Sequence, residues 1–307
     1  MDLKEKIYQL KKLHNAVILA HNYQRGEVQD IADYVGDSLG LSRKASELDC
    51  KVIVFCGVKF MAETAKILSP KKTVLIPRMG ATCPMADMIS VEQLEKLKSE
   101  HPGAVVVSYV NTNADVKAIT DVCCTSANAV KVVQNIKAKE IIFVPDKNLA
   151  NYVRKFTDKK IISCMGHCYV HSKMTAEDVK SARESHKNAP IIVHPECENE
   201  VVELADEVLS TDGMLKFAKA SKAKEIIIGT EEGIIHRLKK ENPNKEFYTL
   251  GPARMCKNMK LTKLEDIYLA LLAESDLNGK ENQYRLELPD EIIRKASLSL
   301  TRMLEYV

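Results

Sequence analysis

The fold is decided by the stretch VILAH at residues 17–21, because its pattern returns twice along the chain. The runs VVVSY at 105–109 and IIVH at 191–194 share its character, a short apolar β-type segment that ends in a polar residue. The final residues of the three runs follow one another at steps of 88 and 85 positions. A period of this length predicts three related structural units in a chain of 307 residues.

Further sets of residues repeat in the same register. Each unit has a hydroxyl-bearing turn after a second short strand, and these hydroxyls again lie 88 and 85 positions apart, at Ser38, Ser126 and Thr211. Each unit is also expected to close on a strand that ends in a cysteine, with steps of 85 and 88, at Cys83, Cys168 and Cys256. Polar-capped helices are predicted to open the units at 2–14, 90–101 and 175–187.

The units alternate short strands with helical patterns, which is typical of a parallel sheet with right-handed crossovers and helices on both faces. We therefore predict an α/β fold of three pseudo-threefold-related, three-layer αβα domains, each with a small parallel sheet, around a central cavity. The expected domains are residues 1–88, 89–173 and 174–260, followed by a C-terminal helical segment, 261–307, that packs back on the first repeat. Ligands of open α/β sheets bind at the carboxyl ends of the strands, so the repeated polar residues are expected to face the cavity.

The residues expected around this cavity can transfer protons and bind small acids. They follow the strands in pairs, one pair in each unit: His21 and Tyr23, Tyr109 and Asn111, His194 and Glu196. His, Tyr and Glu exchange protons, whereas Asn orients a carboxylate or a carbonyl. Taken singly, each residue could be a polar group that caps a strand. Their recurrence at one place in three units favours a shared site.

Ser38, Ser126 and Thr211 each come just before a predicted helix. Their hydroxyls, together with the free backbone N–H groups of a helix N-terminus, can bind a phosphate without a lysine. The alternative is that they only cap the helices. The two roles are compatible, because a capping turn presents the same N–H groups to an anion.

The amino-acid composition argues against several classes of protein. Hydrophobic residues make up 45% of the chain, charged residues 28%, and the net charge is +3, which argues against disorder and against a basic nucleic-acid surface. No apolar run reaches the roughly 18 residues of a membrane span, and the N-terminus does not resemble a signal peptide. We expect a cytoplasmic protein without nucleic-acid or membrane partners. Glycine-rich nucleotide fingerprints are absent from the sequence.

Cysteine usage points to metal chemistry. Nine cysteines, an odd number, fit free thiols or metal ligands of a reducing compartment better than a disulfide framework. Because Cys83, Cys168 and Cys256 hold equivalent positions, one thiol from each unit can meet at the axis. Three thiolates suit zinc or an iron–sulfur cluster with one open iron, and buried inert thiols are a third possibility. The residues alone leave these alternatives open.

Eight motifs in order resemble the quinolinate synthase family over nearly the whole chain. They are HNYQ at 21–24, GDS at 36–38, ATCPMA at 81–86, YVNT at 109–112, TSAN at 125–128, GHCYVH at 166–171, HPEC at 194–197 and MCKNM at 255–259. The resemblance implies three α/β domains around a [4Fe-4S] cluster bound by Cys83, Cys168 and Cys256. It further implies condensation of iminoaspartate with dihydroxyacetone phosphate to quinolinate, with loss of phosphate and two waters, in NAD biosynthesis.

The resemblance also implies roles for single residues. Tyr23 is implied as the acid/base near the reacting carbons, with Glu196 and His21 as further proton-transfer groups that also contact substrate. The open iron would bind the substrate hydroxyl that dehydration removes. The other implied substrate ligands are His194, Tyr109, Asn111, Ser38, Ser126 and Thr211. One departure is that some members carry a C-x2-C-x2-C run at the last cysteine, whereas Cys256 here is followed only by Met259, which removes a disulfide switch of that kind.

Two other functions fit the same residues. A cluster-dependent hydro-lyase acting on another hydroxy acid would need the open iron but no phosphate site. An iron–sulfur sensor or electron carrier would hold a fully ligated cluster and show no turnover. If the resemblance holds, an aspartate-oxidising enzyme is the expected functional partner, and the small-molecule partners are iminoaspartate and dihydroxyacetone phosphate.

Overall fold

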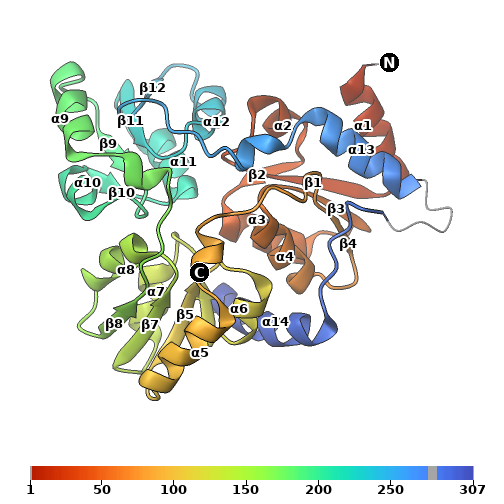
Figure 1. Ribbon diagram of the computed structural model, residues 1–307. Helices are drawn as coiled ribbons and strands as arrows, with labels where there is room; N and C mark the ends of the chain where they lie inside the picture. The colour runs from red at the N-terminus through yellow and green to blue at the C-terminus, as the bar shows by residue number, and fades with distance from the viewer. Residues whose placement is uncertain (1, 276–281, 307) are drawn as a thin grey trace.

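The computed structural model describes residues 2–275 and 282–306. The predicted α/β class is confirmed: three separate four-stranded parallel sheets, each flanked by helices, lie around a common centre (Figure 1). The strand order is the same in each sheet, β2-β1-β3-β4, β6-β5-β7-β8 and β10-β9-β11-β12. The first unit comprises α1 (Leu3–Leu13), β1 (Ala16–His21), α2 (Gly26–Ile31), β2 (Tyr34–Gly36), α3 (Ser38–Glu47), β3 (Val52–Cys56), α4 (Lys59–Leu68) and β4 (Thr73–Leu75).

The second and third units repeat this order of elements. The second comprises α5 (Val91–Glu100), β5 (Val105–Tyr109), α6 (Ala114–Ala118), β6 (Val122–Cys124), α7 (Ala129–Asn135), β7 (Glu140–Val144), α8 (Lys147–Arg154) and β8 (Lys160–Ser163). The third comprises α9 (Ala176–Ser185), β9 (Ile191–Val193), α10 (Asn199–Leu204), β10 (Glu207–Val208), α11 (Thr211–Ala220), β11 (Glu225–Gly229), α12 (Ile234–Glu241) and β12 (Glu246–Thr249). Short 3-10 helices follow the units at η1 (Ala86–Met88), η2 (His171–Lys173) and η3 (Met259–Leu261).

Local sequence explains where the opening helix of each unit begins and ends. Asp2, Ser90 and Thr175 cap α1, α5 and α9, and each forms a reciprocal capping box with the side chain three residues on. The same three helices end at equivalent histidines, His14, His101 and His186. The predicted starts and ends of these helices are therefore confirmed to within one or two residues.

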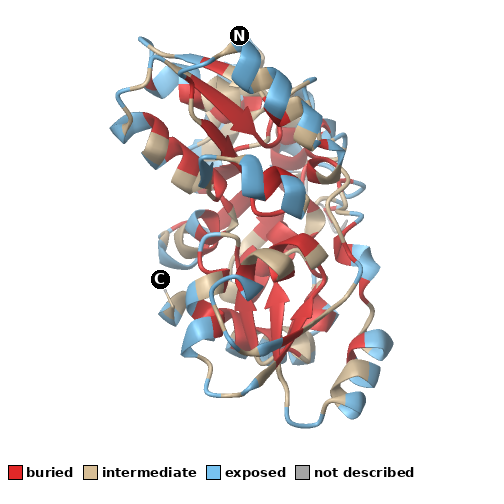
Figure 2. Cartoon of the chain, turned by 90° about the vertical axis from the view of Figure 1, so that its left-hand side faces the viewer, coloured by how far each residue is buried: buried red, intermediate tan, exposed pale blue. Residues whose placement is uncertain are grey.

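The sheets are the most deeply buried parts of the chain. Every residue of β3 is buried, as are those of β6 and β9, whereas the outer helices expose their polar faces (Figure 2). Helices on both faces bury a parallel sheet completely, which explains why these strands are continuous apolar runs. Among the described residues, no helix combines the length and the apolar composition that a membrane crossing requires.

The first and second units share one apolar core, whereas the third is built separately. The shared core includes Ile53 of β3 and Phe143 of β7, and it extends to Leu300 near the C-terminus. The third unit has its own apolar clusters on the two faces of its sheet. Its junction with the first unit is polar: Arg237 donates to the backbone oxygen of Val35 at 2.6 Å. Directional hydrogen bonds of this kind join the third unit to the first, and Met259 of η3 also packs into the shared core.

The C-terminal helices leave the third unit and return to the other two. α13 (Leu264–Ser275) packs on α1 and β3 of the first unit. α14 (Asp290–Glu305) lies instead across α6 and β6 of the second unit and α4 of the first (Figure 1). The expected packing on the first repeat is therefore incomplete for α14, because its apolar side chains join the core that the two units share. Residues 276–281 and 307 of the predicted segment lie outside the described residues, and the domain boundaries stay predictions.

Truncating Leu300 to alanine is expected to lower the free energy of unfolding by about 2–5 kcal/mol, because the side chain is fully buried in the shared core. Leu298 lies on the same helix but is 58% exposed, so Leu298→Ala is the matched control and should change stability by less than about 0.5 kcal/mol. Denaturant unfolding of both variants measures the difference. Equal effects would show that α14 does not bridge the two units.

Candidate functional site

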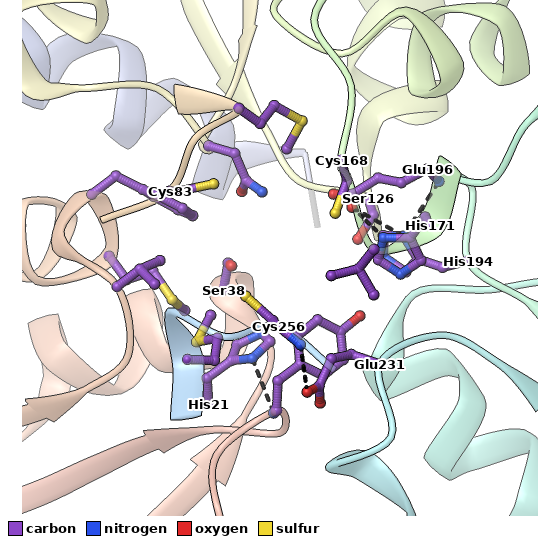
Figure 3. Close-up of a pocket in the computed structure, with 18 of the residues that line it drawn as sticks. His21, Ser38, Cys83, Ser126, Cys168, His171, His194, Glu196, Glu231 and Cys256 are labelled. Atoms are coloured by element: carbon purple, nitrogen blue, oxygen red, sulfur yellow. Dashed lines mark hydrogen bonds and ion pairs between the residues drawn. The ribbon is translucent and has the colours of Figure 1, made fainter. Parts of the chain in front are cut away.

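The carboxyl ends of the three sheets face one central cavity (Figure 3). All residues that the sequence singled out lie in its wall: His21, Tyr23, Ser38, Cys83, Tyr109, Asn111, Ser126, Cys168, His194, Glu196, Thr211 and Cys256. His21 and Tyr109 end β1 and β5, and His194 directly follows β9. The tertiary structure thus brings together residues that are up to 235 positions apart in the chain.

The three cysteines do not end strands as the sequence suggested. β4, β8 and β12 end at Leu75, Ser163 and Thr249, and the cysteines lie in the loops that follow, just ahead of η1, η2 and η3. The expectation was wrong because a sheet edge cannot itself reach the axis of three packed units, so an extended loop spans the remaining distance. The loops also interlock, since Asn258 donates to the backbone oxygen of Thr82 at 2.7 Å.

The donor set fits a polynuclear metal centre better than a single zinc ion. Cys83, Cys168 and Cys256 point into the same cavity from three sides (Figure 3), but their sulfur atoms are not all within 4.8 Å of one another. Tetrahedral zinc with Zn–S bonds of about 2.3 Å would need sulfur atoms about 3.8 Å apart. An iron–sulfur cluster separates its cysteine ligands by the width of the cluster. The three thiols are therefore not gathered as in a closed zinc site, and their convergence from three sides leaves room for a larger metal centre.

Burial keeps these thiols protonated in the protein without metal. It raises the pKa of Cys83 to about 12, and it also raises the pKa of Cys168 and of Cys256. Thiolates are the form that binds metal, so loading a metal centre here must displace protons into water. Three buried thiols that ionise only with a cation are suited to hold a metal centre.

A second cluster of side chains surrounds Glu196. Tyr109 Oη donates to Glu196 Oε1 at 2.6 Å, and His171 Nδ1 lies 2.8 Å from Glu196 Oε2. His194 stacks on His171 with ring centroids 4.7 Å apart. Burial alone would raise the pKa of Glu196, but the neighbouring histidines and the hydrogen bonds from His171 and Tyr109 outweigh it and lower this pKa to about 2. Glu196 is therefore a carboxylate at neutral pH.

Tyr23 is connected to this cluster through Thr230, which the sequence did not indicate, and through His171, which lies three residues after Cys168 in the GHCYVH motif. Tyr23 Oη lies 2.6 Å from Thr230 Oγ1, and Thr230 Oγ1 lies 2.8 Å from His171 Nε2. Two hydrogen bonds thus connect Tyr23 to His171 through Thr230, and the close contact between His171 Nδ1 and Glu196 Oε2 continues the chain of contacts to Glu196. His171 Nε2 contacts Thr230, whereas Nδ1 lies beside Glu196 without a well-formed hydrogen bond, and ligand atoms of Cys168, His171 and Glu196 lie within 4.8 Å of one another. Thr230 directly follows β11, and its position at a strand end was the available signal.

The helix N-termini present backbone N–H groups near the cavity. Asp37 and Ser210 cap α3 and α11 through their own side chains, so Ser38 and Thr211 are the first helical residues. Capping, which was the alternative role for these two hydroxyls, is thus performed by their neighbours. Thr211 Oγ1 accepts from Asn22 Nδ2 at 2.9 Å, which links the first and third units. The Ser126 turn precedes α7, which has seven residues and begins after Asn128.

The stability of the metal-free protein is expected to fall as the pH is lowered. Burial lowers the pKa of His21 and of His194 from 6.5 to about 3, so both stay neutral in the folded chain while the unfolded chain takes up protons below pH 6.5. Each histidine then removes about 1.4 kcal/mol of unfolding free energy per pH unit between pH 6.5 and pH 3. Below pH 4.5, protonation of Glu196 in the unfolded chain adds to the loss. Urea unfolding at several pH values measures the slope, which His194→Asn should reduce; an unchanged slope contradicts the assignment.

Known proteins are similar to this chain over nearly its full length. The sequence pattern of the family described as quinolinate synthetase A protein matches residues 5–305. The quinolinate synthase of Thermodesulfovibrio yellowstonii is 54% identical over 304 residues, which cover 99% of this chain and 98% of that protein. The quinolinate synthases of Geobacter sp. (strain M21) and Methanoregula boonei are 54% and 50% identical over 302 residues, covering 98% of this chain and 97% of each relative. The similarity thus includes all three sheets and α14.

Proposed function

The chain belongs to the quinolinate synthetase A family of enzymes, and from this premise we propose that it condenses iminoaspartate with dihydroxyacetone phosphate. The products are quinolinate, inorganic phosphate and two waters, and with these the atoms of the two substrates balance. The observation that carries the proposal is the convergence of three thiols, an ionised carboxylate and a tyrosine hydroxyl in one cavity.

Cys83, Cys168 and Cys256 would hold a [4Fe-4S] cluster, one thiolate from each unit. When bound, such a cluster offers one iron without a protein ligand, which supplies Lewis acidity for loss of a substrate hydroxyl. The chain's contribution is the set of three buried thiols in interlocked loops. The three sulfur atoms do not all lie within 4.8 Å of one another, which supports this cofactor over a single zinc ion.

Tyr23 would move protons at the reacting carbons through its hydroxyl. Burial raises the pKa of Tyr23 above its ordinary value, so its hydroxyl is protonated at rest and can donate a proton. Thr230 and His171 connect this hydroxyl to Glu196. The Glu196 carboxylate can stabilise a positive charge that forms on His171 when a proton moves along these contacts. His21 packs edge-on against Tyr23 with ring centroids 4.5 Å apart and limits the positions that the phenol ring can adopt.

The remaining residues would bind the two anionic substrates. Tyr109, Asn111 and His194 offer hydrogen bonds to carboxylates and hydroxyls in the cavity wall. Ser38 and Thr211 begin ten-residue helices whose N-termini favour anions, and Ser126 offers a third hydroxyl. These sites explain how a chain with a net charge of only +3 can bind a phosphate ester and a dicarboxylate.

The supply of substrate and the place of reaction are part of the proposal. Iminoaspartate hydrolyses in water, so an enzyme that oxidises aspartate is the proposed functional partner. Free thiols at all nine cysteines fit the reducing cytoplasm, where we expect the reaction to take place.

The test is anaerobic purification with iron and sulfide counts, followed by assays of quinolinate and of released phosphate. The proposal requires about four irons and four sulfides per chain, and one phosphate per quinolinate. Turnover of a hydroxy acid without phosphate release would indicate the alternative hydro-lyase. A cluster whose spectrum does not respond to excess dicarboxylate would indicate a sensor or an electron carrier.

A further inference from the structure

We infer that the buried ion pair between Glu231 and Lys260 is a positioning device, which fixes the backbone of Tyr23 and the backbone of Cys256 relative to each other. The inference rests on the proposed function, because it concerns how the acid/base residue and a cluster ligand are held in place. Glu231 follows β11 directly, next to Thr230, and Lys260 lies in η3, after the loop that carries Cys256. Neither residue was singled out from the sequence.

The ion pair is deeply buried and well formed. Lys260 Nζ lies 3.0 Å from Glu231 Oε1 and 3.1 Å from Oε2. The exposed fraction is 0% for Glu231 and 8% for Lys260. Removing two charges from water is costly, and apolar residues of similar size are often at least as stabilising. A contribution to folding stability is therefore a weak explanation for why this pair is buried. Its contacts indicate that it positions other groups.

The ammonium group of Lys260 holds Tyr23 from the backbone side. Lys260 Nζ donates to the carbonyl oxygen of Tyr23 at 2.6 Å. The hydroxyl at the other end of Tyr23 is bound to Thr230, the residue that precedes Glu231. Tyr23 is thus held at both ends by groups that the 230–231 segment positions, although it belongs to the first unit.

The carboxylate of Glu231 holds the loop of the third cysteine. Glu231 Oε1 accepts the backbone N–H of Cys256 at 3.0 Å, and Oε2 accepts that of Gly233 at 2.7 Å. Together with Lys260, these donors satisfy both carboxylate oxygens. One buried carboxylate therefore connects the loop of the third thiol to the lysine that binds Tyr23.

Gly233 shows how closely the units must approach for this arrangement. A Cβ atom at this position would lie 2.9 Å from the carbonyl carbon of Tyr23 and 2.8 Å from Glu231 Oε2. Gln29 Nε2 adds a bond to the Gly233 carbonyl oxygen at 2.9 Å from the first unit. The absence of a side chain here lets the Tyr23 backbone reach the ion pair.

Substitutions of the two residues of the pair should have different effects. In Glu231→Gln, one carboxylate oxygen becomes an NH2 group, so one backbone N–H loses its acceptor. We expect amide exchange across residues 255–258 of the metal-free protein to accelerate at least about tenfold. In the reconstituted protein, release of iron to a ferrous chelator should accelerate as well. In Lys260→Met, the Tyr23 carbonyl loses its donor, so kcat should fall about tenfold with little change in KM, while exchange across 255–258 changes less.

Three further variants make the result decisive. Lys260→Arg keeps the charge and a donor and should restore part of kcat. The double variant Glu231→Gln/Lys260→Met leaves no unpaired buried charge, so it can be tested even if Lys260→Met does not fold. The effect of the double variant on kcat should be smaller than the sum of the two single effects. Glu274→Gln breaks another ion pair outside the cavity, between the buried Glu274 and the partly exposed Arg285, which lie 2.5 Å apart. It should reduce stability but leave kcat, exchange across 255–258 and iron release at wild-type values.

The inference is overturned if folded Glu231→Gln exchanges and releases iron like the wild type, or if Glu274→Gln has the same effects as the variants of the pair. These outcomes are separable from failure of the proposed function, which would appear as a wild-type protein that makes no quinolinate. The exchange measurement needs neither cluster nor turnover, so it tests the positioning of the Cys256 loop in either case.

Discussion

Replacing Cys168 with alanine should abolish both the iron–sulfur absorbance and quinolinate formation. The cavity offers three thiols from three loops, and removing one leaves two ligands for a cluster that needs three. No other thiol of the described residues lines the cavity: Cys56, Cys123 and Cys124 lie in strands, Cys50 and Cys197 are buried in loops, and Cys164 follows β8. Activity is expected to fall to the detection limit, measured on protein reconstituted anaerobically with iron and sulfide.

Cys164 provides the matched control for this experiment. It lies four residues before Cys168, immediately after β8, and does not line the cavity. Cys164→Ala should therefore keep the wild-type iron content, spectrum and rate. Retained activity in Cys168→Ala would contradict the assignment of this residue as a ligand. Equal losses in both variants would show that the effect comes from misfolding of the loop.

Replacing Tyr23 with phenylalanine should leave the cluster intact and lower kcat by about 10²–10⁴-fold, the usual contribution of a general acid or base. Phenylalanine keeps the ring that packs against His21 but removes the hydroxyl that reaches Thr230. Iron content, sulfide content and the visible spectrum should match the wild type, because Tyr23 provides no thiol. The measurement is steady-state quinolinate formation with both substrates saturating.

Tyr248 is a suitable control for the loss of a hydroxyl. It lies in β12, packs on His186 with ring centroids 4.3 Å apart, and is outside the cavity wall. Tyr248→Phe should keep the wild-type rate. If Tyr23→Phe also keeps it, Tyr23 only packs in the cavity, and proton transfer must be assigned to another residue.

Much of the fold could be predicted because it follows from local sequence. β1, β5 and β9 are short apolar runs at a fixed period, and the capping residues of α1, α5 and α9 are recognisable within four positions. The resulting αβα units with parallel sheets are confirmed. The packing of α14 across two units was not predicted, because its apolar face does not specify which unit covers it.

The threefold repeat pointed to residues that line the cavity, but it gave no sign of residues that occur in one unit only. Residues at equivalent positions, such as Cys83 and Cys168, were identified because chance alone does not repeat a cysteine in register. Thr230 and Lys260 have no counterparts of the same type in the other units, and Glu231 has an acidic counterpart only in Asp146 of the second unit, so the period gave little sign of them. Their roles depend on contacts between the first and third units, which no local pattern contains.

The sequence by itself determined three α/β units, the set of polar residues at their strand ends, and the family. These depend on interactions between residues close in the chain or on residue identity at matching positions. Only the tertiary structure decided that the thiols lie in interlocked loops, that Tyr23 is connected to Glu196 through Thr230 and His171, and that a buried ion pair joins Tyr23 to the Cys256 loop. The physical reason is that a hydrogen bond between distant segments depends on ångström-scale packing of whole units, and that packing is fixed by the folded chain as a whole.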